Sequence, residues 1–300
     1  MRVAIISTSW PRSNGDPSGH FVRTEALQLS IHHEVTILAP DAPSERAFDV
    51  IPLVGGGAFG WPGALAKLRQ NPLALGSAAL WVKRARAVLS AAGPFDRVIA
   101  HWAIPSAWPI SVREESLEIV SHGSDTRVIA HMPLALRRRV VFALAERARP
   151  WRFVSAALLE RFLNSLSSDE TMRVARVATI RPCAIEVPDV RSAARDKQRE
   201  IGFPFVTAIG RLVPEKRTER ILEVAANERM PIVVVGDGPE RARLERLARH
   251  AVVKFTGQLP RHEALAWLGA SQSLWFASKI EGLPTVVREA EALGIPVRHL

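Results

Sequence analysis

Two glutamates near the end of the sequence are spaced so that they could bind hydroxyl groups. Glu281 and Glu289 enclose the run Gly-Leu-Pro-Thr-Val-Val-Arg. Proline suits the first turn of a helix, where its missing N–H would be unpaired in any case, so Pro284 predicts a short helix here. The positive end of a helix dipole favours anions. The amides that could donate hydrogen bonds to such an anion belong to Gly282, Leu283 and Thr285. We expect a phosphate or a polar sugar edge at these amides and hydroxyl groups at the two carboxylates, with Glu289 off the apolar stripe of the helix.

A second segment carries basic groups suited to a diphosphate. The apolar run Phe205–Ile209 is followed by Gly210-Arg211-Leu-Val-Pro-Glu-Lys216. The planar fork of an arginine and the compact charge of a lysine could together bind a diphosphate. Lys216 is the more informative residue because lysine is scarce beside arginine in this chain. An ordinary solvated basic loop is the alternative.

Two further loops follow apolar runs in the first half. His122 comes directly after Leu117–Ser121, so its imidazole should emerge at a strand end, where it could hydrogen-bond a sugar hydroxyl. A purely structural histidine is the alternative. Gly19 lies in a glycine-containing loop whose amides could approach a phosphate, although the spacing is neither that of a Walker loop nor Gly-x-Gly-x-x-Gly. The pair Gly236 and Gly238 predicts a tight strand-to-helix turn.

Composition limits the class of protein. A chain of 300 residues with 47% hydrophobic content is globular and long enough for two domains. Cys183 is the only cysteine, which excludes an intrachain disulfide and a cysteine metal cluster. There is no Asp-x-Asp pair to hold a metal against a diphosphate, so we expect no metal and no other cofactor. The sequence shows no signal-peptide pattern and no apolar span that could cross a bilayer, and we expect a cytoplasmic protein.

The net charge of +10 suits nucleic acid, anionic lipid or small anionic substrates. No zinc-finger, recognition-helix or RNA-binding aromatic signature accompanies the charge, so we expect no nucleic-acid partner. The segment Leu134–Arg147 combines apolar residues with four arginines and predicts a basic amphipathic helix. Such a helix could dock on the inner face of an anionic membrane. A solvated face is the alternative, and the sequence predicts no oligomeric state.

Short apolar runs alternate with helical patterns, which predicts repeated βα units and parallel sheets. We expect a doubly wound α/β domain over residues 1–185, a polar linker over 186–200, and a second such domain over 201–300. Expected strands lie near residues 3–7, 34–39, 97–101, 117–121, 152–154, 205–209, 232–235, 252–255 and 274–276. Expected helices lie near residues 22–30, 64–89, 134–147, 218–226, 240–249 and 261–268. Ligands of such folds bind beyond the carboxyl ends of the strands.

Taken together, the chain resembles the retaining GT-B glycosyltransferases of glycosyltransferase family 4, also called group 1. Five ordered motifs spread over nearly the whole chain carry the resemblance: residues 15–20, 122–125, 210–216, 234–239 and the Glu281–Glu289 segment. The resemblance implies a fold of two Rossmann-like domains facing a cleft. It also implies a nucleotide sugar as donor and a saccharide or lipid-linked acceptor.

The resemblance implies a role for each candidate residue. Arg211 and Lys216, in the loop that begins at Gly210, would bind the donor diphosphate and stabilise the leaving group. Glu281 and the amides after it would hold the sugar, and Glu289 would bind the ribose. His122 would contact the transferred sugar, and Gly19 would line the phosphate side of the cleft. The chemistry implied is front-face transfer with retention, in which a donor phosphate oxygen takes the acceptor proton.

The implied pathway is synthesis of a cell-surface polysaccharide, a lipopolysaccharide or a glycolipid. Members of the family normally continue past the Gly-x-Pro-Val motif, which here ends at Val297, three residues before Leu300. We therefore expect a truncated chain with an incomplete second domain, which puts its activity in question. The alternatives are an inactive remnant that only binds a nucleotide sugar, and a GT-B sugar-nucleotide epimerase, which would convert its donor without an acceptor.

Overall fold

The computed structural model describes residues 1–13, 15–16, 18–53, 58–59, 71, 73–110, 116–249, 252–278 and 283–300. The chain forms two compact units. The first comprises Met1–Ser13 and Ser18–Ala184, and the second comprises Asn14–Pro17 and Ile185–Leu300.

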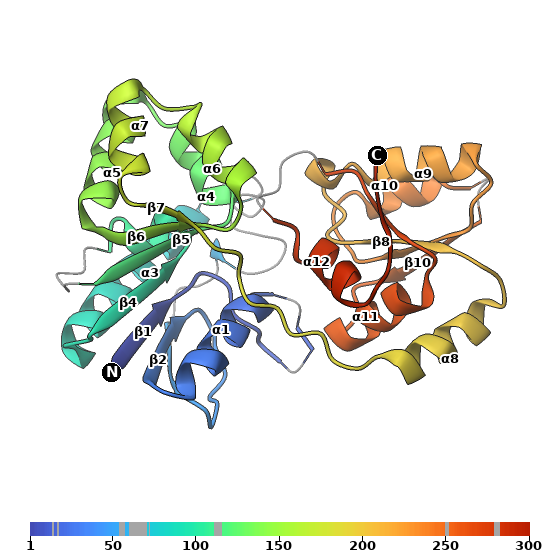
Figure 1. The fold of residues 1–300 in the computed structure, drawn as a ribbon, viewed down its shortest axis with the longest axis horizontal. Helices are drawn as coiled ribbons and strands as arrows, with labels where there is room; N and C mark the ends of the chain where they lie inside the picture. The colour runs from blue at the N-terminus through green and yellow to red at the C-terminus, as the bar shows by residue number, and fades with distance from the viewer. Residues whose placement is uncertain are drawn as a thin grey trace. The chain divides into compact units, whose positions relative to one another are not determined.

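The first unit is built on a seven-stranded sheet in the order β3-β2-β1-β4-β5-β6-β7 (Figure 1). The pairings along this sheet are parallel. Parallel strands are covered on both faces, so they read as continuous apolar runs, and Val3 to Ile6 are almost fully buried. The strands are β1 Arg2–Ile6, β2 Glu34–Ala39, β3 Asp49–Pro52, β4 Arg97–His101, β5 Leu117–Ser121, β6 Ala148–Phe153 and β7 Ala178–Ile180.

Helices connect and flank these strands. Local sequence defines several helix starts: the Ser155 hydroxyl caps α6, and Ser167 with Glu170 forms a capping box at α7. The helices are α1 His20–Ser30, α3 Ala74–Ala92, α4 Ser124–Ala130, α5 Leu134–Arg147, α6 Ala156–Leu163 and α7 Ser168–Ala175, with an irregular helical turn η2 at Ala103–Ala107.

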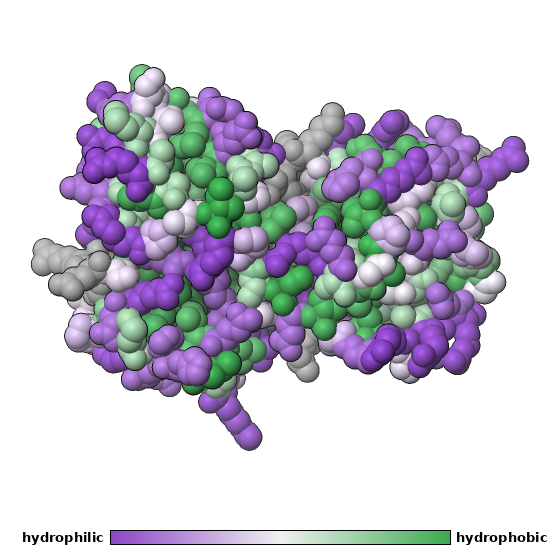
Figure 2. Space-filling view, viewed as in Figure 1, coloured by the Kyte–Doolittle hydropathy of each residue, from purple (hydrophilic) through white to green (hydrophobic). Residues whose placement is uncertain are grey.

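The second unit is built on a five-stranded parallel sheet in the order β10-β9-β8-β11-β12. Its strands are β8 Val206–Ile209, β9 Ile232–Val235, β10 Val253–Gly257, β11 Leu274–Phe276 and β12 Val297–His299. Its helices are α8 Arg191–Ile201, α9 Thr218–Asn227, α10 Arg241–Leu247, α11 Arg261–Ala270 and α12 Thr285–Ala292, with a 3-10 turn η3 at Pro214–Lys216. Figure 2 shows hydrophilic residues interspersed with smaller hydrophobic patches on the visible face of both units.

Each sheet reverses its direction of winding once. In the first unit the chain runs from β1 outward to β3 and then returns to place β4 on the other side of β1. In the second it runs from β8 outward to β10 and returns to place β11 beside β8. The loops that leave two such neighbouring strands diverge at their carboxyl ends and open a crevice where ligands of this class of fold bind. The candidate sites are thus expected after β1 and β4, and after β8 and β11.

The predicted class of fold, two doubly wound α/β sheets, is confirmed. Residues 191–200 of the predicted linker lie in helix α8, which packs on α11 through Ala194 and Trp267. Of the helix predicted over 64–89, residues 64–70 and 72 lie outside the described residues, and α3 begins at Ala74. Strands β3 and β7 and helices α4, α6 and α7 were not predicted.

Candidate functional site

The basic loop of the second unit leaves β8 at the switch point. Gly210 and Arg211 follow the strand, the turn η3 ends at Lys216, and α9 begins at Thr218. Two backbone bonds hold this loop against the one after β9: the Leu212 amide donates to the Asp237 carbonyl at 2.8 Å, and the Glu240 amide donates to the Leu212 carbonyl at 3.0 Å. The backbone that carries Arg211 and Lys216 is therefore fixed by a neighbouring loop.

The glycines of the β9 loop allow this close approach. A Cβ atom on Gly236 would lie 1.9 Å from the Gly210 carbonyl oxygen, and one on Gly238 would lie 2.4 Å from the Leu212 carbonyl oxygen. Gly236 also has a φ of +136°, which residues with a side chain rarely adopt. The Gly-Asp-Gly run thus lets one strand-end loop pack directly on the other, in addition to forming the predicted tight turn.

The electrostatics of the loop favour an anion. Burial, with the positive charge of Arg211 as a second cause, lowers the pKa of Lys216 to about 7. Removal from water disfavours the charged form of an amine, and a nearby like charge disfavours it further. A bound anion would reverse both effects by adding negative charge at hydrogen-bond distance. The pair is thus suited to a polyanion such as a diphosphate.

The other side of the switch point is formed by the segment after β11. The Ser278 hydroxyl donates to the Glu215 carbonyl at 3.2 Å, which joins this segment to the basic loop. Glu281 and Gly282 lie outside the described residues. Leu283 is half-buried, and Thr285 is the first residue of α12, directly after Pro284. The structure thus places the start of the predicted short helix one residue after the proline.

Contrary to the prediction, Glu289 does not lie on the solvated face of helix α12. Its side chain is buried, with 8% exposure, and is ion-paired with Arg261 at the start of α11. The Nε and Nη2 atoms of Arg261 both donate to Oε1 of Glu289, at 2.9 and 2.7 Å. The same Nη2 donates to the carbonyl of Glu186. This pair was not predicted, because its members are 28 residues apart in the chain.

In the first unit, His122 follows β5 as predicted, and its ring is half-buried. Its Nε2 lies 3.1 Å from Nδ1 of His101, at the end of β4, and its Nδ1 lies 3.9 Å from Sγ of Cys183. The backbone is held by Asp125, whose Oδ1 accepts from the amides of His122 and Gly123. Burial, followed by the charges of His101 and Arg152, lowers the pKa of His122 well below its usual value. The ring is neutral at neutral pH.

Gly19 closes the loop after β1 and precedes α1. Its φ is +65°, and a Cβ atom there would lie 2.3 Å from the Ser9 carbonyl oxygen. A glycine is therefore required by both backbone conformation and space. Its own carbonyl accepts from the amides of Val22 and Arg23 in the first turn of the helix.

Several residues around His122 were missed from the sequence. Phe21 and Trp102 pack on its ring, with centroids 5.0 and 4.5 Å away. Trp102 has a φ of +66°, which is uncommon for a residue with a side chain and occurs at functional sites. Their position in the sequence could have identified these residues. His101 and Trp102 lie at the carboxyl end of one parallel strand, and His122 lies at the carboxyl end of the neighbouring strand.

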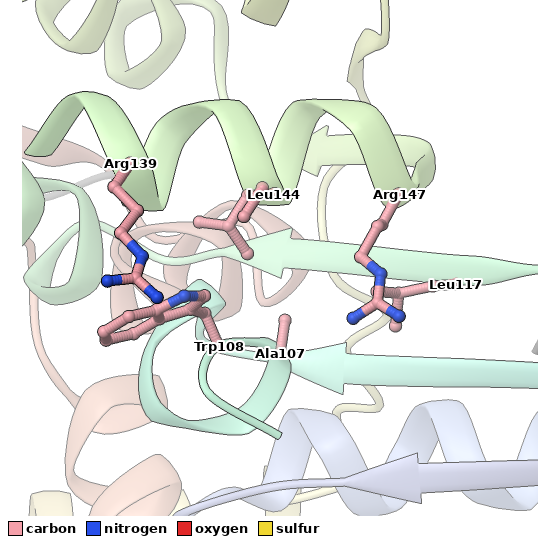
Figure 3. A pocket seen from close by; sticks show the side chains of 7 residues that line it. Ala107, Trp108, Leu117, Arg139, Leu144 and Arg147 are labelled. Carbon is pink, nitrogen blue, oxygen red and sulfur yellow. The ribbon is translucent and has the colours of Figure 1, made fainter. Parts of the chain in front are cut away.

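A cavity of about 220 Å³ lies beside α5 in the first unit (Figure 3). Arg139 and Arg147 flank it, and Trp108 and Leu144 form its apolar wall. The pocket adjoins Leu117, the first residue of β5, whereas His122 follows the last. Two other arginines of α5 are ion-paired with α7, Arg137 to Glu170 and Arg138 to Asp169. The helix thus presents less basic charge than its sequence indicates.

We searched the described residues for a metal site and for a membrane-spanning helix. Among these residues, no three histidine, cysteine, aspartate or glutamate side chains gather as a metal site would require. None of the described helices combines the length and the apolar content needed to span a bilayer.

Comparison with known proteins finds similarity to glycosyltransferases. Residues 190–297 match the model of the family "Glycosyl transferases group 1". A GDP-mannose-dependent alpha-mannosyltransferase of Mycolicibacterium smegmatis is 28% identical over 99% of this chain and 79% of its own length. A sucrose-phosphate synthase from Thermosynechococcus elongatus has a similar structure, with a TM-score of 0.72 and 17% identity over 100% of this chain and 81% of that one. Anabaena HepE, solved with UDP-glucose, has a TM-score of 0.63 and 17% identity over 100% and 80% of the two chains.

Proposed function

We propose that the chain is a group 1 glycosyltransferase with the GT-B fold, and that it transfers a sugar from a nucleotide-sugar donor with retention of anomeric configuration. The acceptor that we propose is a saccharide or a lipid-linked saccharide. The product would belong to a cell-surface polysaccharide, a lipopolysaccharide or a glycolipid. The predicted truncation of the chain stays a prediction, and so does the retaining mechanism until it is measured.

The observation that supports this proposal most is the basic loop at the switch point of the second sheet. Arg211 and Lys216 lie in a loop that is fixed by Asp237 and Glu240 on one side and by Ser278 on the other. A preorganised pair of cations stabilises the charge that develops on a leaving diphosphate without reorganising during the reaction. Such a pair has more effect in a site shielded from water, and Lys216 is shielded.

We propose the remaining roles from the resemblance of the sequence motifs. Glu281 and the amides of Gly282, Leu283 and Thr285 would hold the sugar at the start of α12. His122 would bind a hydroxyl of the transferred sugar, and Gly19 would line the phosphate side of the loop after β1. The acceptor hydroxyl would lose its proton to an oxygen of the donor phosphate, so no side-chain base is needed.

We also propose that the reaction needs no metal ion. The sequence has no Asp-x-Asp pair, the usual way in which a protein holds a divalent cation against a diphosphate. The two basic side chains would neutralise the leaving group in its place. Activity should therefore persist in excess EDTA.

Substitution of the two basic residues tests the site. We expect Arg211→Ala and Lys216→Ala each to weaken the binding of UDP or GDP by at least about tenfold, and to lower kcat/KM by about 100-fold or more. Calorimetric titration measures the first effect and initial rates the second. Arg246→Ala, at an exposed position of α10, is the matched control and should leave both unchanged. Unchanged affinity in both site variants would remove this assignment.

The same titration tests Glu289 as the ribose ligand. Glu289→Gln keeps the size of the side chain and removes its charge. We expect the variant to lose most of the preference of the protein for ribonucleoside over 2′- or 3′-deoxyribonucleoside diphosphates, because a neutral amide accepts more weakly from a hydroxyl. Equal preference in variant and parent would mean that Glu289 does not bind the ribose.

We propose further that α5 docks the enzyme on an anionic membrane surface through Arg139 and Arg147, beside the exposed Leu134 and Leu136. Basic residues near a charged bilayer each contribute about 1 kcal/mol at moderate salt. Arg139→Glu should reduce co-sedimentation with liposomes of anionic lipid, and Arg195→Glu on α8 is the charge-matched control. Failure of the unchanged protein to sediment with such liposomes at low salt would rule out this docking.

A further inference from the structure

A buried ion pair lies behind His122 in the first unit. The Nη2 atom of Arg152 donates to both carboxylate oxygens of Glu25 at 2.7 Å, and both side chains are more than nine-tenths buried. The Nε atom of Arg152 also lies 3.0 Å from Oε1 of Glu118. A buried arginine keeps its charge, and Glu25 and Glu118 both lie within ion-pair distance of it. Glu25 is therefore the buried counter-ion of Arg152.

This charge orients the ring of His101. The imidazole is fully buried at the end of β4, and its Nε2 lies 3.8 Å from Oε2 of Glu25. A nitrogen lone pair this close to a carboxylate oxygen would be repelled, whereas an N–H is attracted. The proton of the neutral ring is therefore favoured on Nε2, which leaves Nδ1 of His101 as a lone-pair acceptor.

The hydrogen bond between the two histidines makes the tautomer of His122 depend on that of His101. Nδ1 of His101 lies 3.1 Å from Nε2 of His122. Burial, with Arg152 among the further causes, lowers the pKa of both rings well below the usual value, so both are neutral. A hydrogen bond between two neutral imidazoles needs one donor and one acceptor. If His101 accepts, Nε2 of His122 must donate.

We propose that His101 is a positioning residue that holds His122 with its proton on Nε2 and its Nδ1 as an acceptor for a hydroxyl of the transferred sugar. This inference rests on the proposed function for the nature of the ligand, but not for the tautomer. Nδ1 faces the Cys183 thiol at 3.9 Å, which is consistent because an S–H is a donor. A sugar hydroxyl is a stronger donor to the same lone pair. The consequence is selectivity for a hydroxyl over a group that can only accept.

The tautomer can be measured without substrate. Long-range ¹H–¹⁵N correlation spectra of protein labelled in histidine distinguish a protonated from an unprotonated ring nitrogen, and loss of one signal set in His122→Asn assigns the residue. His131 is an internal standard of opposite form, because its Nδ1 must donate to the Arg127 carbonyl at 2.7 Å. We expect His122 at neutral pH to carry its proton on Nε2. A proton on Nδ1 would overturn the inference and leave the proposed function untouched.

The role of His101 is tested by His101→Phe, which keeps a ring and removes the acceptor. We expect a new population of His122 with its proton on Nδ1, whereas His131→Phe, at an exposed position, should leave His122 unchanged. An unaltered tautomer in folded His101→Phe would show that His101 does not position it. If that variant does not fold, Glu25→Gln applies the same test, because it removes the charge that favours the proton on Nε2 of His101.

The functional consequence is tested with donor sugars in which single hydroxyls are replaced by fluorine, which cannot donate. At one ring position we expect kcat/KM of the parent enzyme to fall about tenfold, the value of one hydrogen bond. We expect this penalty to shrink in His101→Phe, where Nδ1 of His122 can be protonated. A panel without any such position, in an enzyme that turns over the parent donor, would overturn the role of Nδ1 while leaving the glycosyl transfer established.

Discussion

At the scale of single residues, Lys216 shows how a binding group can be tuned by its surroundings. Its amine is buried beside Arg211, and the free protein therefore holds it close to half-protonated at neutral pH. A diphosphate placed against it would favour the charged form and raise its pKa. Binding and protonation are thus linked at this residue.

We predict that the binding of UDP or GDP takes up a proton in a defined pH window. Below the free-state pKa of about 7, Lys216 is already charged, so little is taken up. Above that value the free amine is neutral while the complex keeps it charged, so uptake approaches one proton between pH 8 and the raised pKa. Calorimetry in buffers of different ionisation enthalpy measures it. Lys216→Gln should abolish the uptake, and uptake that persists in this variant would assign it to another group.

At the scale of elements, the proposed donor site depends on two strand-end loops that pack without side chains between them. Gly236 and Gly238 bring the β9 loop against the carbonyls of Gly210 and Leu212. The basic loop is thereby positioned by backbone contacts of a different βα unit. A change in the second loop should therefore affect ligand binding without touching a charged residue.

We predict that Gly236→Ala weakens nucleotide binding and lowers the free energy of unfolding by more than about 2 kcal/mol, because its Cβ would clash with the Gly210 carbonyl. Gly202→Ala is the matched control. Gly202 has a φ of +78° but open space around it, so it should cost only the conformational penalty of about 1 kcal/mol and leave binding intact. Chemical denaturation and nucleotide titration measure both effects. Equal losses in the two variants would show that the backbone conformation, rather than the contact, matters.

The sequence predicted the long buried strands well and the short ones poorly. Apolar runs such as those of β2, β4 and β9 are continuous because both faces of a parallel strand are covered. The edge strands β3 and β7 have four and three residues and are half-exposed, so they carry little pattern. The candidate residues His122 and Arg211 lie just after strand ends, where the sequence placed them. The partners Glu25 and Arg152 were not predicted, because 127 residues separate them and only the folded sheet brings them together.

At the scale of the whole molecule, both units have the same arrangement of strands around a switch point. Each unit is a parallel sheet with one switch point, and the strand ends there carry chemistry of a different kind: neutral histidines and aromatic rings in the first, and the basic residues Arg211 and Lys216 in the second. This division suits a reaction that needs recognition of neutral sugar hydroxyls and stabilisation of a charged leaving group. We therefore propose that the protein transfers a sugar from a nucleoside diphosphate with retention.

The most direct test is turnover of a panel of UDP- and GDP-linked hexoses, in excess EDTA, followed by ¹H NMR of the anomeric protons. We predict that at least one donor is hydrolysed or transferred and that the first product has the anomeric configuration of the donor. A product of inverted configuration would contradict the retaining mechanism. Epimerisation of the donor without an acceptor, or binding without any product, would contradict the claim that this chain is an active transferase.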